Sequence, residues 1–241
     1  MHFLRKGWKS STEEVLRLKR FLCLLVCLSF LILQVRAAPA EKLVALTFDD
    51  GPSGRFTRRL LAGLEARGAK ATFLLCGYRM ELYPELVEKI LAEGHEIGLH
   101  GYSHKPMECM RPVELREELE KTLALVPERE TVRFLRTPGG AVNSRIREEA
   151  KKLGLSVLFW SVDPRDWATE DALAIETAVL DSVRDGDVIL LHDMTDSSVE
   201  AALSILEKLQ RQGFRFVTVS ELAKSRNIGL TAGEVYAHFR K

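Results

Sequence analysis

The chain lacks the features that mark nucleic-acid-binding and nucleotide-binding proteins. Its 35 basic and 34 acidic side chains leave a net charge of +1, and no Arg- or Lys-rich stripe alternates with aromatic residues in its body. No glycine-rich phosphate loop follows the first apolar run of that body. We therefore expect no nucleic-acid partner, and nucleotide binding is disfavoured.

Cysteine is scarce, and repeats are absent. The four cysteines form no CxxC pair and no Cys/His zinc ribbon. Two of them, Cys23 and Cys27, lie in an apolar N-terminal run, which leaves Cys76 and Cys109. An exported protein can join such residues in a disulfide, and two separate thiols are the alternative. A hydrophobic content of 46% is ordinary for a globular protein with a full core.

The N-terminus has the layout of an export signal. An uncharged apolar run, Phe21–Val35, is followed by the small-residue pattern Ala38-Pro39-Ala40. Six basic residues precede the run: Arg5, Lys6, Lys9, Arg17, Lys19 and Arg20. The run is shorter than the roughly 20 residues of a spanning helix, but the long basic segment leaves an uncleaved membrane anchor open. Either way, the sequence predicts that residues 1–40 direct export and that residues 41–241 are exported, secreted or held at the outer face of the cytoplasmic membrane.

From Leu43 onward, short apolar runs alternate with amphipathic stretches. Apolar residues spaced by three and four are typical of helices with one buried face, and short apolar runs are typical of buried strands. Strands are predicted at Leu43–Phe48, Ala71–Leu75, Glu96–Leu99, Val132–Leu135, Ser156–Trp160, Val188–Leu191 and Phe214–Val219. Helices are predicted at Arg58–Arg67, Pro84–Glu93, Pro112–Leu125, Ser144–Leu153, Thr169–Val183 and Ser198–Gln212.

This alternation predicts an α/β fold in which crossover helices join parallel strands. About seven units in some 180 residues favour an irregular, incomplete (β/α) barrel, and an open doubly wound sheet is the alternative. In both architectures the chemistry lies at the C-terminal ends of the strands. For the tail from Lys224 to Lys241 we expect a short helix packed on the barrel.

Polar residues follow the apolar runs at those ends. The first run ends in Asp49-Asp50, the third in His100-Gly101-Tyr102-Ser103-His104 and the sixth in His192-Asp193. Two histidines four residues apart, with one carboxylate from elsewhere, make a metal site with three protein ligands and an open position for water. Zinc in such a site lowers the pKa of bound water to about 7 and polarises a carbonyl.

The remaining strand-end residues suit acid–base chemistry. Of Asp49 and Asp50, one would bind the metal and the other would take a proton from water. Arg136 can keep that base ionised, although a surface salt bridge is the commoner fate of an arginine. Asp166 can raise the pKa of His192 and orient it as a general acid. A histidine at the edge of the core is the alternative for His192.

Five motifs, taken in order, resemble the NodB-homology polysaccharide deacetylases of carbohydrate esterase family 4. They are TFDDGP at 47–52, HGYSH at 100–104, RTPGG at 136–140, DPRDW at 163–167 and Leu190-Leu191-His192, and the match covers about residues 42–222. The resemblance implies an incomplete (β/α) barrel. It also implies metal-dependent removal of acetyl groups from N-acetylated sugars in a polysaccharide.

The resemblance also implies roles for individual residues. Asp50, His100 and His104 would bind one divalent metal ion, with zinc the first expectation and other transition metals open. Asp49 would be the base, assisted by Arg136, and His192 the acid, tuned by Asp166. For the substrate, Trp167 and Leu190 would line the pocket for the acetyl methyl, and a backbone N–H near Gly139 would help to hold the oxyanion.

Two residues depart from the family pattern. Gly101 replaces the Ser or Thr that usually follows the first histidine, so we expect a looser metal site. Gly139 stands where many members carry an aromatic residue that walls the sugar groove, so we expect a wider cleft.

Peptidoglycan is the first expectation for the substrate, and chitin fragments and exopolysaccharide are alternatives. A membrane-anchored glycan-binding protein without catalysis is a second function, with Gly101 as the feature that favours it. A non-haem iron oxygenase, which also uses two His and one carboxylate, ranks third because it needs no acid–base pair.

Overall fold

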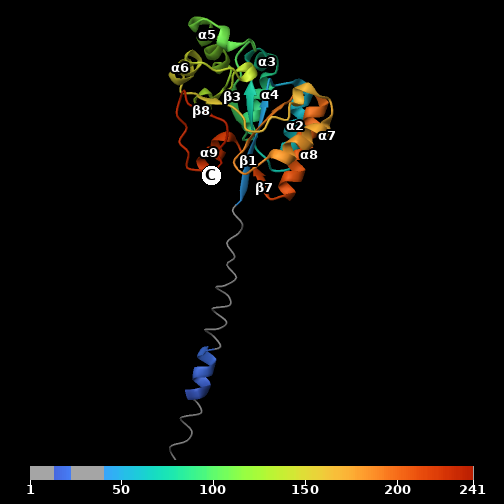
Figure 1. Cartoon of the computed structure of the whole chain (residues 1–241), viewed down its shortest axis with the longest axis vertical. Helices are drawn as coiled ribbons and strands as arrows, with labels where there is room; N and C mark the ends of the chain where they lie inside the picture. The colour runs from blue at the N-terminus through green and yellow to red at the C-terminus, as the bar shows by residue number, and fades with distance from the viewer. Residues whose placement is uncertain (1–13, 23–40, 241) are drawn as a thin grey trace, which may run out of the picture. The chain divides into compact units, whose positions relative to one another are not determined.

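The computed structural model describes residues 14–22 and 41–240 (Figure 1). The chain divides into two units after Ala40, and the second is described by itself below. Residues 14–22 form a helix. The predicted export segment lies mostly outside the described residues, including nearly all of its apolar run. Within the described ranges, no helix has both the length and the apolar content needed to cross a membrane.

Residues 41–240 form an alternating α/β unit. Its strands are β1 (Lys42–Asp49), β2 (Ala71–Leu75), β3 (Glu96–Leu99), β4 (Phe134–Leu135), β5 (Ser156–Leu158), β6 (Val188–His192), β7 (Phe214–Phe216) and β8 (Val235–Tyr236). Its helices are α2 (Gly54–Glu65), α3 (Gly77–Leu82), α4 (Pro84–Ala92), α5 (Pro112–Leu123), α6 (Ser144–Lys152), α7 (Ala172–Ser182), α8 (Asp196–Arg211) and α9 (Val219–Ser225).

The strands form one curved parallel sheet. Their order is β6-β1-β2-β3-β4-β5-β8, and β7 pairs with the first residues of β1. The two sides of the sheet meet at two isolated bridges rather than along a continuous ladder. Val162, beyond the end of β5, pairs with Ile189 of β6, and Asp187, directly before β6, pairs with His238, beyond the end of β8. The barrel is therefore incomplete. The predicted α/β class and parallel, partly closed barrel are confirmed.

Side chains of β1 alternate between two cores. On β1, Val44, Leu46 and Phe48 pack in the larger cluster, which also contains helix residues. Leu43 and Ala45 pack in the smaller cluster, which draws on β1, β2, β4, β5 and β6 and on the tail. Because successive side chains of a strand point to opposite faces, odd-numbered residues of β1 face the barrel interior. That phase carries Asp49 inward.

The same alternation applies to three other strands. Phe134 of β4 and Val188 of β6 belong to the interior cluster, so Arg136 and His192, two and four residues later, follow the interior phase. Ile97 and Leu99 of β3 pack in the outer cluster, which gives His100 the interior phase as well. Strand periodicity thus aims four polar side chains at one end of the barrel.

Several local predictions are wrong. The described part of the tail, residues 224–240, has no helix of its own: α9 begins at Val219 and ends at Ser225, and β8 then pairs with β5. The last predicted strand ends three residues early, because the Thr218 hydroxyl accepts a hydrogen bond from the Glu221 N–H and caps α9. The sequence also gave no indication of α3, which is only six residues long.

Candidate metal and acid–base site

The turn after β1 brings two adjacent carboxylates to one imidazole. Asp50 has a left-handed backbone, with φ of 71°, which departs from the alternation of an extended strand. Asp49 Oδ2 lies 3.8 Å and Asp50 Oδ1 3.3 Å from His100 Nε2. The left-handed backbone of Asp50 thus lets the side chains of two neighbouring residues reach the same cavity.

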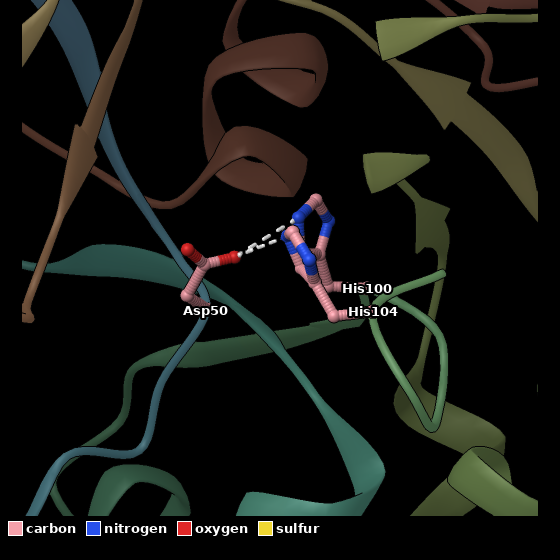
Figure 2. A group of neighbouring side chains, drawn as sticks. All are labelled: Asp50, His100 and His104. Atoms are coloured by element: carbon pink, nitrogen blue, oxygen red, sulfur yellow. Dashed lines mark ion pairs between the residues drawn. The ribbon is translucent and has the colours of Figure 1, made fainter. Parts of the chain in front are cut away.

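Asp50, His100 and His104 form the three-residue cluster expected of a metal site (Figure 2). Their candidate ligand atoms all lie within 4.8 Å of one another, and Asp50 Oδ1 is 2.9 Å from His104 Nε2. Figure 2 shows the carboxylate pointing toward both rings. The two histidines come from one loop after β3 rather than from a helix, with left-handed backbone at Gly101 and His104.

The donor atoms fit a divalent cation. His100 Nδ1 lies 2.8 Å from the backbone oxygen of Arg136, so this nitrogen donates and the Nε2 lone pair faces the cluster. Asp50 Oδ1 is buried and has no partner with hydrogen-bond geometry, although two imidazole nitrogens lie close to it. Two neutral imidazoles and one carboxylate are a ligand set that zinc and related transition metals accept.

The charge state of the Asp50 carboxylate suits a metal ligand. Burial raises the pKa of Asp50, but the contacts and charges of His100 and His104 outweigh burial and hold that pKa well below its usual range. The same contact with Asp50 raises the pKa of His104. Asp50 is therefore ionised at neutral pH, as a metal ligand must be.

Asp49 is held by a fully buried arginine. Arg136 Nη1 donates to Asp49 Oδ1 at 2.7 Å and to the Thr47 hydroxyl at 2.8 Å. The other guanidinium nitrogens donate to the backbone oxygens of Leu158 and Phe159, at 3.1 and 2.9 Å. One oxygen of Asp49 is thereby fixed by Arg136, and Oδ2 is the oxygen on the side of His100. Arg136 is buried in the barrel rather than in a surface salt bridge.

His192 is held by a buried carboxylate. Asp166 Oδ1 lies 2.8 Å from His192 Nδ1, and Oδ2 accepts the His192 backbone N–H at 2.8 Å. Burial lowers the pKa of His192, but the hydrogen bond and charge of Asp166, with a contribution from Asp49, raise it overall to about 9. The imidazole is therefore protonated at neutral pH. In the β1–β6 register, Asp49 is the direct partner of His192.

The three predicted substrate residues differ in exposure. Leu190 is buried, pairs with Thr47 and lies two residues before His192, so both side chains share the interior phase. Trp167 follows Asp166 and is 60% exposed. Gly139 lies in a turn three residues after Arg136, and no atom lies within 4 Å of where its side chain would begin. The space beside Gly139 is therefore open.

Two carboxylates next to the site were missed by the sequence reasoning. Asp193 is fully buried against Gly51 and accepts a hydrogen bond from the Thr57 hydroxyl. Burial raises the pKa of Asp193 to about 6. Its position after His192 was visible, but its burial was not. The Glu118 carboxylate of α5 accepts two backbone hydrogen bonds from the loop between the two histidines. It stands among several glutamates of one helix, and nothing in the sequence distinguishes it from them.

Comparison with known proteins identifies the family. Residues 36–158 match the family model described as polysaccharide deacetylase. The chain belongs to this family. The chain is 37% identical over 194 residues to a peptidoglycan-N-acetylglucosamine deacetylase of Bacillus cereus, a match that covers 78% of this chain and 91% of that protein.

Other members of the family differ in length and in the glycan that they are named for. Peptidoglycan-N-acetylmuramic acid deacetylase PdaC of Bacillus subtilis is 36% identical, and the match covers 76% of this chain but 39% of that protein. Its solved structure superposes with a TM-score of 0.74 at 33% identity, covering 79% of this chain and 94% of the solved one. A family 4 acetyl xylan esterase from Clostridium thermocellum, solved with a cobalt ion, superposes with a TM-score of 0.75 at 31% identity. The superposition covers 82% of this chain and 98% of the solved one.

Proposed function

We propose that the chain is a metal-dependent hydrolase that removes N-acetyl groups from amino sugars in a polysaccharide, with peptidoglycan as the first candidate substrate. Family membership supports the reaction class, and relatives named for peptidoglycan support the substrate. One observation carries the mechanism. Asp49, paired with buried Arg136, and His192, paired with buried Asp166, lie in register on neighbouring strands beside a three-ligand cluster.

Asp50, His100 and His104 would hold the ion. A divalent cation in such a site supplies Lewis-acid polarisation of a carbonyl and lowers the pKa of water. Zinc is our first assignment, because two imidazoles and a carboxylate suit it. Because one relative was solved with a cobalt ion, cobalt and other transition metals are tested alongside zinc.

Asp49 and His192 divide the proton transfers. Asp49, held in place by Arg136, takes a proton from the attacking water through Oδ2. His192, protonated and oriented by Asp166, gives a proton to the nitrogen of the sugar as the C–N bond breaks. The products are acetate and a free amino sugar. A backbone N–H near Gly139 donates to the developing oxyanion, and Leu190 and Trp167 line the pocket for the acetyl methyl.

The location of the protein follows from the same proposal. We assign residues 1–40 to export, as a cleaved signal or a membrane anchor, and residues 41–241 to the deacetylase domain. An enzyme that acts on peptidoglycan must meet it outside the cytoplasmic membrane. The alternative, a glycan-binding protein without catalysis, would share this location.

Acetate release tests the proposal. The purified protein, supplied with zinc or cobalt, is incubated with peptidoglycan, N-acetylglucosamine oligomers and acetylated xylan, and acetate and free amines are measured. We expect acetate and new amines from the amino-sugar substrates and none after chelation. Asp49→Asn should abolish turnover and still bind metal, whereas Asp181→Asn, at an exposed position, should act as wild type.

Two outcomes would overturn parts of the proposal. Glycan binding without acetate release, with several divalent metals supplied, would support the non-catalytic alternative. Full activity of Asp49→Asn would remove Asp49 from its role, and an iron-dependent activity that persists in this variant would favour the oxygenase.

A further inference from the structure

The loop between the two histidines is supported in a way that the sequence did not indicate. Gly101 stands where the family pattern has Ser or Thr, and a looser metal site was expected for that reason. Gly101 has φ of 79°, a backbone conformation that costs an L-residue about 1–2 kcal/mol. A side-chain carbon at this position would lie 2.5 Å from Met107 Cε. Met107 Cε is the end of a flexible side chain and can move aside, so it is the positive φ that would strain the usual Ser or Thr in this loop.

The carbonyl groups of the loop bond to α3. Gly101 and Tyr102 accept hydrogen bonds from the backbone N–H groups of Gly77 and Tyr78, at 2.9 and 3.0 Å. These bonds fix one edge of the loop. The loop's own N–H groups point elsewhere and need an acceptor, because an unpaired backbone group away from water costs free energy.

Glu118 of α5 supplies that acceptor. Its Oε2 accepts the N–H groups of both Tyr102 and Ser103, at 2.7 and 2.9 Å. Its Oε1 accepts the Ser103 hydroxyl. One partly buried carboxylate thus takes three hydrogen bonds from two successive residues that lie between the metal-binding histidines.

A second contact ties the same loop to α5. The Lys121 ammonium lies 3.3 Å from the centre of the Tyr102 ring, three residues beyond Glu118 and therefore on the same face of the helix. The Tyr102 hydroxyl in turn donates to Glu81 of α3 at 2.7 Å. The loop is held between α3 and α5, which Figure 1 draws at the same end of the unit.

We propose that Glu118 is a positioning residue that fixes the His100–His104 loop through hydrogen bonds and so sets the metal affinity of the site. The inference rests on the proposed metal function and deepens it. It also bears on the looser metal site expected from Gly101. In the family pattern a hydroxyl within the loop supports it, whereas here the Glu118 carboxylate supports the loop from α5. Groups that orient metal ligands are commonly worth about 10- to 100-fold in metal affinity.

Metal affinity, measured without substrate, separates positioning from other roles. Zinc and cobalt dissociation constants of the full chain are determined by competition with a chelating indicator. Glu118→Ala should weaken binding by about 10- to 100-fold. Glu118→Gln should stay within about threefold of wild type, since its carbonyl can accept both N–H groups and its amide can donate to Ser103 Oγ. Glu117→Ala, an exposed neighbour that removes the same charge, should match wild type.

Each result decides a different claim. If the wild-type protein binds neither ion, the proposed metal function fails. If the wild type binds and Glu118→Ala binds as tightly, this inference is overturned and the function stands. If Glu118→Gln is as weak as Glu118→Ala, charge rather than hydrogen bonding is responsible and the positioning role is wrong.

A milder variant covers the case in which Glu118→Ala does not fold. Ser103→Ala removes one of the three hydrogen bonds and leaves Glu118 in place. We expect about 2- to 10-fold weaker zinc binding, the equivalent of one hydrogen bond. Unchanged affinity in this variant would also count against the proposal.

Discussion

Asp166→Asn tests the acid half of the mechanism, because Asp166 is what keeps His192 protonated at neutral pH. Asparagine can still accept the His192 backbone N–H through its carbonyl, so the loop keeps that hydrogen bond. Its amide then faces Nδ1 and cannot stabilise an imidazolium. The pKa of His192 should fall from about 9 to its ordinary value of 6.5 or below, since burial also lowers it.

The size of the effect follows from the two pKa values. The acid works only when protonated, so activity is present below the pKa of His192 and lost as pH rises through it. At pH 8, a group with a pKa of 9 is about 90% protonated and a group with a pKa of 6.5 about 3%. With these pKa values, which hold for the protein without its cation, protonation alone predicts a loss of about 30-fold at this pH and a much smaller loss at pH 5.5.

The assay is the pH profile of kcat for acetate release between pH 5 and 10. A bound cation lowers the pKa of His192 in both proteins, so the displacement between the two alkaline limbs is the quantity to compare. Glu170→Gln, at an exposed carboxylate four residues away, should leave the limb unmoved. A uniform loss of rate with an unshifted limb in Asp166→Asn would refute the assigned role.

Three further substitutions probe stability and binding. Arg136→Met leaves Asp49 buried without its cation and should lower the free energy of unfolding by about 3–5 kcal/mol in urea, whereas Arg133→Met, at an exposed arginine, should change it by less than about 0.5 kcal/mol. Thr57→Val removes the hydroxyl that donates to buried Asp193 and should cost about 1–3 kcal/mol in the same assay; an unchanged midpoint would mean that Asp193 has another donor. Trp167→Ala, at a 60% exposed side chain, should raise the KM for the glycan about fivefold with thermal stability unchanged, and an unaltered KM would exclude this residue from the substrate site.

Periodicity made most of the barrel predictable. The phase of apolar residues on β1, β4 and β6 determines which polar residue at the end of each strand faces inward. The same rule explains why Asp49, Arg136 and His192 meet. The predicted barrel of parallel strands is correct for this reason.

Contacts between distant segments were not predictable from periodicity. Whether Asp50 joins Asp49 at the same imidazole depends on a left-handed turn, to which Asp, Gly and Pro give only a general preference. Glu118 lies fifteen residues beyond the loop that it bonds, and its neighbours on α5 are chemically the same. Short elements such as β8 gain their stability from pairing rather than from local sequence, so the tail was assigned to the wrong structure.

The most direct test of the central claim is an anomalous difference map, recorded at the zinc absorption edge, from crystals grown with zinc. We predict one strong peak at about 2.0–2.2 Å from a carboxylate oxygen of Asp50 and from Nε2 of both His100 and His104. A zinc ion bound by other residues, or these three side chains turned away from one another in a zinc-saturated crystal, would contradict the account.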